Sequence, residues 1–232
     1  MKNFLMILGV MLFSLTLFAT TIHDVQFTTD AGDGTYPSTL ADQVVTVQGV
    51  VTATGYSGGK FFIQDGEGAW NGIYIFDWNT PVSLGDLVSV TGTVSEYYGF
   101  TEINNVTNIT IISSGNPVPQ PAVLTTNEVA TSEAYEGVLV RVQNVTVAIG
   151  LDDHSQWYVT DGSGNCQIDD GIFNLDDAGI AVNVGDSWGS ITGVVDYGYD
   201  EFSINPRSAE DLSTTPVSSI SKSWGQVKSL YK

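Results

Sequence analysis

The sequence predicts an all-β protein built as two tandem five-stranded barrels. No long helical period follows residue 20, whereas short β-rich stretches recur with Gly, Asp or Asn between them. A strand–turn–strand stretch at residues 60–76 returns in altered form at residues 156–173. Its flanking segments return with it, which is the pattern of a duplicated module. A β-sandwich is the alternative fold with a similar strand pattern.

Residues 1–20 have the pattern of a secretory signal peptide. Lys2 supplies a positive charge, residues 4–18 are almost wholly apolar, and small or polar residues follow. The apolar run is shorter than the ~20 residues that a membrane-spanning helix needs, so we expect no span after cleavage. The sequence therefore indicates an exported bacterial protein, either secreted, periplasmic or held at the cell surface.

The charge balance is strongly acidic. The chain has 26 Asp and Glu against 7 Lys and Arg, a net charge of -19. Such a surface repels phosphate backbones and favours either solubility or the collection of divalent cations. Cys166 is the only cysteine, which excludes an intrachain disulfide and a two-cysteine metal site.

The first repeat, residues 21–112, contains the strands of one barrel. The long strand at residues 40–54 carries Gly49 in its middle, which permits a bulge or a sharp bend. Turn residues at 65–68 separate two short β-rich stretches. The strands expected in this repeat run over residues 21–27, 40–54, 60–64, 71–76, 87–96, 100–103 and 108–112.

A Pro-rich segment at residues 113–123 is expected to link the two repeats, because its prolines oppose regular structure and stiffen the chain. The second repeat covers residues 124–212 and begins with a short helical turn. Its SITGVV at residues 190–195 matches SVTGTV at residues 89–94. The offset between matching segments grows slowly along the chain, as small loop insertions would cause.

Residues 213–232 form a Ser/Thr-rich spacer and a short tail. Trp224, Val227 and Tyr231 recur at the spacing of one helix face, with three lysines around them. This tail is a basic patch on an acidic protein. We expect residues Trp224–Lys232 to contact the cell surface or the secretion machinery.

The order of long bent strand, hairpin and two further strands is that of an OB barrel. Four motifs carry a closer resemblance: GVVTA at 49–53, FFIQDG at 61–66, GIYIF at 72–76 and VTGTV at 90–94. With them the chain resembles two tandem copies of the OB-fold modules attached to secreted bacterial nucleases and related exported proteins. In such proteins the module assists binding and precedes a separate catalytic domain. The two repeats leave no length for such a domain here, so we expect a protein that is not an enzyme.

The first candidate site is an aromatic ligand face on the first repeat. OB barrels bind ligands on their second and third strands, often by stacking on aromatic rings. The alternative is that half of these rings form the barrel core, because side chains alternate along a strand. Lys60 is the only cation of this repeat, so a sugar or a peptide fits better than nucleic acid. The predicted ligand-binding residues are Phe62, Trp70, Tyr74, Phe76 and Tyr98.

The second candidate site is a calcium site in the second repeat. Asp161, Ser163 and Asn165 place oxygen ligands at every other residue, as calcium loops do. Ile172 stands where such a loop has its last glutamate, so a plain hairpin turn is the competing interpretation. If the acidic loops converge, the ion would be Ca²⁺ and its ligands would be Asp152, Asp153, Asp161 and Asp169.

These patterns lead to one functional hypothesis and one alternative. The hypothesis is an exported, non-enzymatic binding or assembly protein whose ligand is a carbohydrate, a peptide or a nucleic acid. The alternative is a calcium-assisted, nucleic-acid-binding accessory of an extracellular nuclease system. The two histidines, His23 and His154, have no catalytic motif around them.

Overall fold

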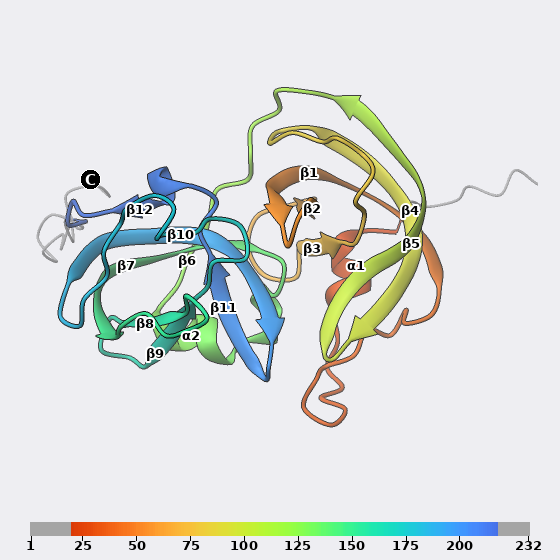
Figure 1. The fold of residues 1–232 in the computed structure, drawn as a ribbon. Helices are drawn as coiled ribbons and strands as arrows, with labels where there is room; N and C mark the ends of the chain where they lie inside the picture. The colour runs from red at the N-terminus through yellow and green to blue at the C-terminus, as the bar shows by residue number, and fades with distance from the viewer. Residues whose placement is uncertain (1–19, 218–232) are drawn as a thin grey trace, which may run out of the picture.

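The first barrel closes in the strand order β1-β2-β3-β5-β4, as Figure 1 shows. The computed structural model describes residues 20–217, so the predicted signal peptide (all but Thr20) and the C-terminal tail lie outside the described residues. The one parallel pair of this barrel joins β3 to β5. Its strands are β1 (Val44–Tyr56), β2 (Lys60–Gln64), β3 (Gly72–Ile75), β4 (Leu87–Tyr97) and β5 (Phe100–Ser113).

Strand β1 pairs with two neighbouring strands, and it bends between the two pairings. Residues 44–50 pair with β4, and residues 50–56 pair with β2. The register shifts between Val51 and Ala53, two residues beyond the predicted position at Gly49. A Cβ at Gly49 would lie 3.0 Å from the carbonyl oxygen of Gln64, so glycine there permits the close approach of β2.

The second barrel repeats this order as β7-β8-β9-β11-β10, and pairing of β10 with β7 closes it. The predicted all-β fold of two five-stranded, OB-like barrels is therefore confirmed, and the sandwich alternative is not. Two short strands extend the sheet at its edges. The strands are β6 (Ala122–Val123), β7 (Leu139–Ile149), β8 (Trp157–Thr160), β9 (Asn165–Ile168), β10 (Ser187–Gly198), β11 (Glu201–Asn205) and β12 (Leu212–Ser213).

Each barrel is preceded by a short helix with the same N-terminal cap. The strand predicted at residues 21–27 is wrong, because Thr21 and Asp24 form a capping box that starts a helix. Thr125 and Glu128 form the equivalent capping box in the second repeat. The helical segments are α1 (Ile22–Gln26), α2 (Thr126–Thr131), η1 (Glu133–Tyr135) and η2 (Ala209–Asp211). None of the helices found within residues 20–217 has the length and apolar content to cross a bilayer.

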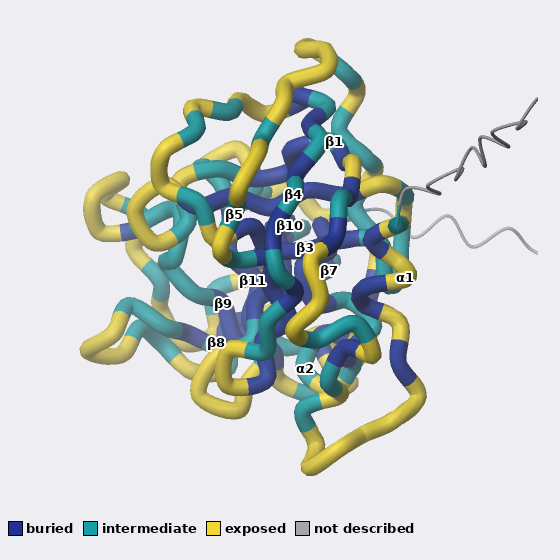
Figure 2. Tube along the Cα trace, turned by 90° about the vertical axis from the view of Figure 1, so that its right-hand side faces the viewer, coloured by how far each residue is buried: buried dark blue, intermediate teal, exposed yellow. Residues whose placement is uncertain are grey.

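Each barrel has its own core, and Figure 2 shows the buried residues along the strands and the exposed ones on the loops. Burying one large aliphatic or aromatic side chain contributes about 1.5–3 kcal/mol, so these clusters dominate the stability of the barrels. The first core includes Ile22, Phe61, Ile63, Ile73 and Ile103. The second includes Trp157, Val159, Ile168, Ile191 and Ile204.

A third apolar cluster joins the two barrels, and we call it the seam. Backbone approaches closely here: a Cβ on Gly72 would lie 2.2 Å from the carbonyl oxygen of Gly137. The Gln64 side-chain oxygen accepts a hydrogen bond from the Leu139 amide at 2.6 Å. The buried members of the seam are Ala53, Phe62, Tyr74 and Phe100 from the first barrel and Leu139 and Val194 from the second.

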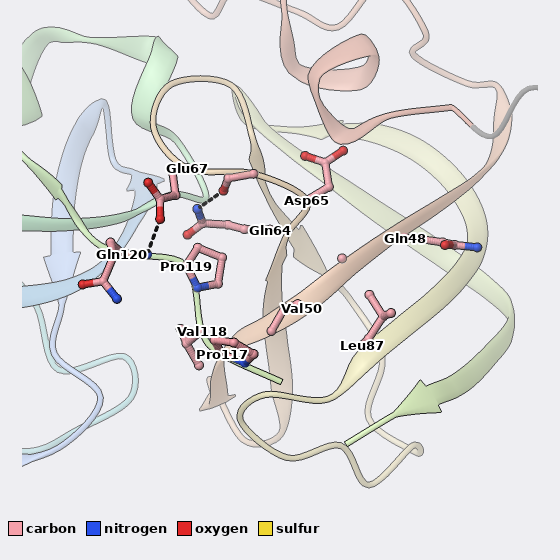
Figure 3. Close-up of a pocket in the computed structure, with 12 residues that line it drawn as sticks. Gln48, Val50, Gln64, Asp65, Glu67, Leu87, Pro117, Val118, Pro119 and Gln120 are labelled. Carbon is pink, nitrogen blue, oxygen red and sulfur yellow. Dashed lines mark hydrogen bonds between the residues drawn. The ribbon is translucent and has the colours of Figure 1, made fainter. Parts of the chain in front are cut away.

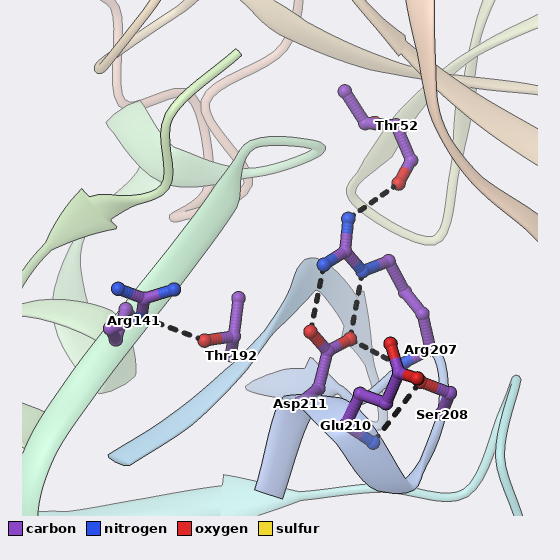
Figure 4. A network of polar contacts seen from close by, with 7 residues as sticks. All are labelled: Thr52, Arg141, Thr192, Arg207, Ser208, Glu210 and Asp211. Carbon is purple, nitrogen blue, oxygen red and sulfur yellow. Dashed lines mark hydrogen bonds and ion pairs between the residues drawn. The ribbon is translucent and has the colours of Figure 1, made fainter. Parts of the chain in front are cut away.

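Polar contacts also cross between the barrels. The Tyr56 hydroxyl donates to the Asp196 carboxylate at 2.5 Å. Arg207 forms an ion pair with Asp211 at 2.7 Å and donates to the carbonyl oxygen of Thr52 at 3.1 Å, as Figure 4 shows. The guanidinium therefore links the end of the second barrel to β1 of the first.

Residues 114–121 contain no helix or strand and lie against the first barrel. The Asn116 amide donates to the Gly85 carbonyl at 2.8 Å, and Val118 packs against the seam. The Gln120 amide donates to Glu67 at 3.4 Å, as Figure 3 shows. The predicted role of residues 113–123 as a linker, and the domain limits 21–112 and 124–212, stay predictions.

Candidate ligand-binding site

Two of the predicted ligand-binding aromatics are buried in the seam. Phe62 is 0% exposed and Tyr74 is 4% exposed. The Tyr74 ring stacks on Phe100 at a centroid distance of 5.1 Å. The second barrel covers this face of β2 and β3, so Phe62 and Tyr74 hold the barrels together and a ligand cannot reach them. This corrects the prediction that they line a ligand face.

Trp70 and Phe76 are placed separately from that face. Trp70 contacts Phe27 edge-on at 5.5 Å, and its amide donates to the Ala134 carbonyl at 2.6 Å. Phe76 is partly exposed and, with Trp78, flanks the ammonium of Lys60. The Lys60 nitrogen lies 3.8 Å from the Trp78 ring centroid and 4.8 Å from that of Phe76. Phe76 therefore takes part in an internal cation–π contact.

Tyr98, the last of the predicted residues, is freely accessible. It lies in the turn between β4 and β5 and is 85% exposed. Its neighbour Tyr97 contacts it edge-on at 4.9 Å. The structure places these two rings beside Tyr197 and Tyr199 of the second barrel, around one cavity.

The second barrel leaves open the face that the first barrel buries. A groove of about 560 Å³ runs across β8, β9 and β11. Side chains of the β7–β8 loop and of the β10–β11 hairpin border it, and these are the places where OB barrels take their ligands. The lining residues are His154, Gln156, Tyr158, Gln167, Gly198, Tyr199 and Glu201.

Three polar side chains form the floor of this groove. The Tyr158 hydroxyl donates to the Glu201 carboxylate at 2.7 Å. The Gln167 side-chain amide donates to Glu201 and to the Tyr158 oxygen, both at 2.9 Å. The phenol of Tyr158 is protonated at neutral pH, as in any ordinary tyrosine, and the hydrogen bond to Glu201 raises its pKa further. The floor therefore offers a ring face, an amide and a carboxylate held in fixed positions.

The same three side chains border a second hollow of about 420 Å³. Ile149 and Phe202 give this hollow an apolar wall. Tyr158 thus lines both cavities. A ligand in either cavity would contact this side chain.

The groove residues occupy the same strand positions as the seam aromatics. Phe62 pairs with Tyr74 across β2 and β3, and Tyr158 pairs with Gln167 across β8 and β9. The first residue of β5 is an aromatic that enters the seam, whereas the first residue of β11 is Glu201. The first repeat is therefore apolar where it is covered, and the second is polar where it is open.

No Lys or Arg of the described chain lines this groove. Residues 20–217 hold all 26 acidic residues but only three Lys and Arg residues, Lys60, Arg141 and Arg207. Lys60 lies between two rings, and Arg207 is paired with a carboxylate. The Arg141 guanidinium donates to the Thr192 hydroxyl at 2.9 Å, also drawn in Figure 4. The groove thus presents oxygen and amide groups with no fixed positive charge.

Two of the predicted calcium ligands lie next to the groove. Asp152 accepts hydrogen bonds from the amides of His154 and Gln156 at 2.8 and 3.0 Å. Asp169 accepts from the Gln156 side chain at 3.2 Å, and burial raises the pKa of its carboxyl group. Asp153 is exposed in the same loop as Asp152. Gln156 therefore stands between Asp152 and Asp169.

Asp161 lies apart from these residues and fixes the start of α2. Its carboxylate accepts from the amide and hydroxyl of Thr126 at 3.2 and 2.8 Å, and from Ser163. Burial opposes ionisation, but these hydrogen bonds outweigh it and lower the pKa of Asp161 to about 2. Within residues 20–217 no three Asp, Glu, His or Cys side chains come together as a metal site would require. Calcium binding stays a prediction.

A further cavity, of about 480 Å³, lies under the Pro-rich segment (Figure 3). Its acidic residues already have partners in the fold. Asp65 accepts from the Ile22 amide at 2.8 Å, and Glu67 accepts from the Gln120 amide. This cavity is therefore better explained by chain packing than by a ligand.

Tyr158, Gln167 and Glu201 were not predicted from the sequence. A signal for them was present, because Tyr158 follows from Phe62 when the two repeats are aligned on their Asp-Gly turns at residues 65 and 161. Which copy of the face is open depends on how the barrels dock. That arrangement is a property of the folded molecule.

Comparison with known proteins relates the chain to part of a much longer protein. No protein-family model matches the chain. Among curated proteins, the chain is similar to Endonuclease YhcR of Bacillus subtilis (strain 168), with 30% identity over 192 residues. The match covers 74% of this chain and 15% of the endonuclease, so the chain spans a small part of that protein's length.

Proposed function

We propose that the chain is a binding module that holds a neutral oligosaccharide in the groove across β8, β9 and β11. One observation carries the proposal: equivalent positions are apolar and covered in the first barrel, but polar and open in the second. A barrel face that served only the fold would have no need of a fixed hydrogen-bond network at an open groove.

The chemistry of the groove favours a ligand rich in hydroxyl groups. Glu201 and Gln167 supply hydrogen-bond acceptors and donors, and Tyr158 supplies a ring face for stacking. The described surface is acidic and its cations are engaged elsewhere, so phosphate groups would be repelled. OB faces bind oligosaccharides as well as oligonucleotides.

We propose a non-enzymatic role for this module, outside the cell. The chain matches 15% of the length of the endonuclease, which is a fraction typical of an accessory module within a larger protein. The apolar run after Lys2 supports export. The binding role and the location are thus argued from separate features.

A second candidate is calcium-assisted binding of nucleic acid, favoured by the similarity to a protein named as an endonuclease. Asp152 and Asp169 flank Gln156 at the rim of the groove. A Ca²⁺ ion held there would supply the positive charge that phosphate needs and the groove lacks.

The test is calorimetric titration with neutral β-linked glucose and N-acetylglucosamine oligomers. We expect binding by the native chain, and a loss of about tenfold or more in Tyr158→Ala, because this variant removes both the ring face and the hydroxyl; a tenfold loss equals roughly 1.4 kcal/mol. Phe76→Ala removes an exposed ring outside the groove and should bind as the native chain does. Equal losses in both variants, or no binding of any neutral oligomer, would refute the proposal.

A second titration uses single-stranded DNA with and without calcium. Binding that requires calcium, and that falls in Asp152→Asn, would replace the carbohydrate proposal by the nucleic-acid candidate. We expect no binding of DNA in either condition, because the groove presents carboxylates to the phosphates.

A further inference from the structure

The two barrels each carry a tyrosine at the tip of their last hairpin. The β4–β5 hairpin turns at Tyr98 and Gly99, and the β10–β11 hairpin turns at Tyr199 and Asp200. Both are two-residue turns, and each follows a paired glycine of the repeat by the same number of residues, since Gly92 matches Gly193. The tip tyrosine is therefore a feature of both copies of the module.

The two tips meet in space. A Cβ on Gly99 would lie 2.9 Å from a ring carbon of Tyr197, so the second barrel's hairpin packs directly on the turn of the first. In Figure 1 both hairpins point toward the lower edge of the molecule. A cavity of about 520 Å³ lies between them. Its lining is Tyr97, Tyr98, Tyr197, Gly198, Tyr199 and Asp200.

Neither folding nor packing accounts for the tyrosines at the two hairpin tips. Tyr98 and Tyr199 are 85% and 99% exposed, so their rings contribute almost nothing to a core. Both have a left-handed backbone with φ of 53°, where a bulky L-residue is disfavoured and Asn or Gly is the usual choice. Exposed aromatic surface held in a strained turn is a feature of binding sites.

The tyrosine cavity continues the groove of the second barrel. Gly198 and Tyr199 line both of them. A ligand that lies on Tyr158 can therefore extend past Tyr199 onto Tyr98 of the first barrel. The continuous surface ends on a different barrel from the one on which it begins.

We propose that Tyr97, Tyr98, Tyr197 and Tyr199 form a platform that binds the extension of a linear neutral polysaccharide chain. This inference rests on the proposed function and narrows its ligand from a small sugar to a polymer. Successive sugar rings present C–H faces that stack on tyrosine rings, while Asp200 accepts hydrogen bonds from their hydroxyls. The carboxylates of Asp200 and Glu201 disfavour a polyanionic chain at this surface.

The test compares a disaccharide with a hexasaccharide of the β-linked glucose and N-acetylglucosamine series. We expect the native chain to bind the hexasaccharide more tightly than the disaccharide. Tyr98→Asn gives the turn the favoured Asn-Gly sequence and leaves the groove intact. It should lower hexasaccharide affinity by about two- to tenfold, the range of one aromatic contact, and leave disaccharide affinity unchanged. Phe76→Ala should retain both affinities.

The outcomes separate this inference from the proposed function. Binding of the disaccharide and hexasaccharide with equal affinity, or an equal effect of Tyr98→Asn on both, would overturn the platform alone. No binding of either sugar would overturn the proposed function. Binding of oligothymidylate that is lost in Tyr98→Asn would assign the platform to single-stranded nucleic acid and overturn the polysaccharide.

Discussion

The tyrosines at the two hairpin tips have a backbone conformation that is unfavourable for their residue type. Tyr98 occupies a left-handed turn position that asparagine or glycine fills at lower cost. We predict that Tyr98→Asn increases the free energy of unfolding by about 1 kcal/mol, because a left-handed conformation costs most L-residues roughly 1–2 kcal/mol and asparagine less. Urea denaturation of the two proteins measures this difference.

Tyr97 is the matched control, because it is adjacent to Tyr98 and exposed, but its backbone in β4 is not left-handed. Tyr97→Asn should give no gain in stability. A Tyr98→Asn protein that is no more stable than the native one would mean that the ring makes a stabilising contact at the tip. A gain in stability together with a loss of hexasaccharide affinity would separate folding from binding at a single position.

At the scale of elements, the sequence predicted the strands better than it predicted the helix before them or the packing of one barrel on the other. Period-two alternation and Gly-containing turns sufficed for most barrel strands, since both are local signals. The strands predicted at residues 100–103 and 108–112 form one strand, β5. The helix at Thr21 was missed, although Thr21 and Asp24 have the spacing of a capping box. Alternation predicted that some of the aromatic rings point into the barrel core. It could not show that another barrel covers Phe62 and Tyr74, because docking depends on contacts between distant residues.

For the whole molecule, buried carboxyl groups of the second repeat, close to the first barrel, make stability depend on pH. Glu136 is fully buried and accepts a hydrogen bond from the Thr101 amide at 3.0 Å, and burial holds its pKa well above 4.5. Burial, assisted by the nearby Glu96, raises the pKa of Glu133 to about 8. Burial also raises the pKa of Asp196 at the Tyr56 contact to about 6. These groups stay protonated in the folded state at pH values where the unfolded chain loses the proton.

The sign of the effect follows from proton binding. Between about pH 4.5 and 8 the folded state binds more protons than the unfolded state, so stability falls as pH rises, by up to ~1.4 kcal/mol per pH unit for each proton. We predict a higher thermal midpoint at pH 5 than at pH 8. Glu136→Gln should raise the midpoint at pH 8 and weaken the dependence on pH. A midpoint that increases from pH 5 to pH 8 would show that the carboxyl groups of Glu133, Glu136 and Asp196 are ionised in the folded protein.

Burial of one copy of a duplicated face and exposure of the other is the central claim of this account. Amide chemical-shift mapping of the isotope-labelled chain during titration with a β-linked hexasaccharide tests it directly. We predict that the shift changes concentrate at Tyr158, Gln167 and Glu201 and at the hairpin-tip residues Tyr98 and Tyr199. The amides of Phe62 and Tyr74 should not shift. Shift changes centred on Phe62 and Tyr74, with no change in the residues of the second-barrel groove, would contradict this claim.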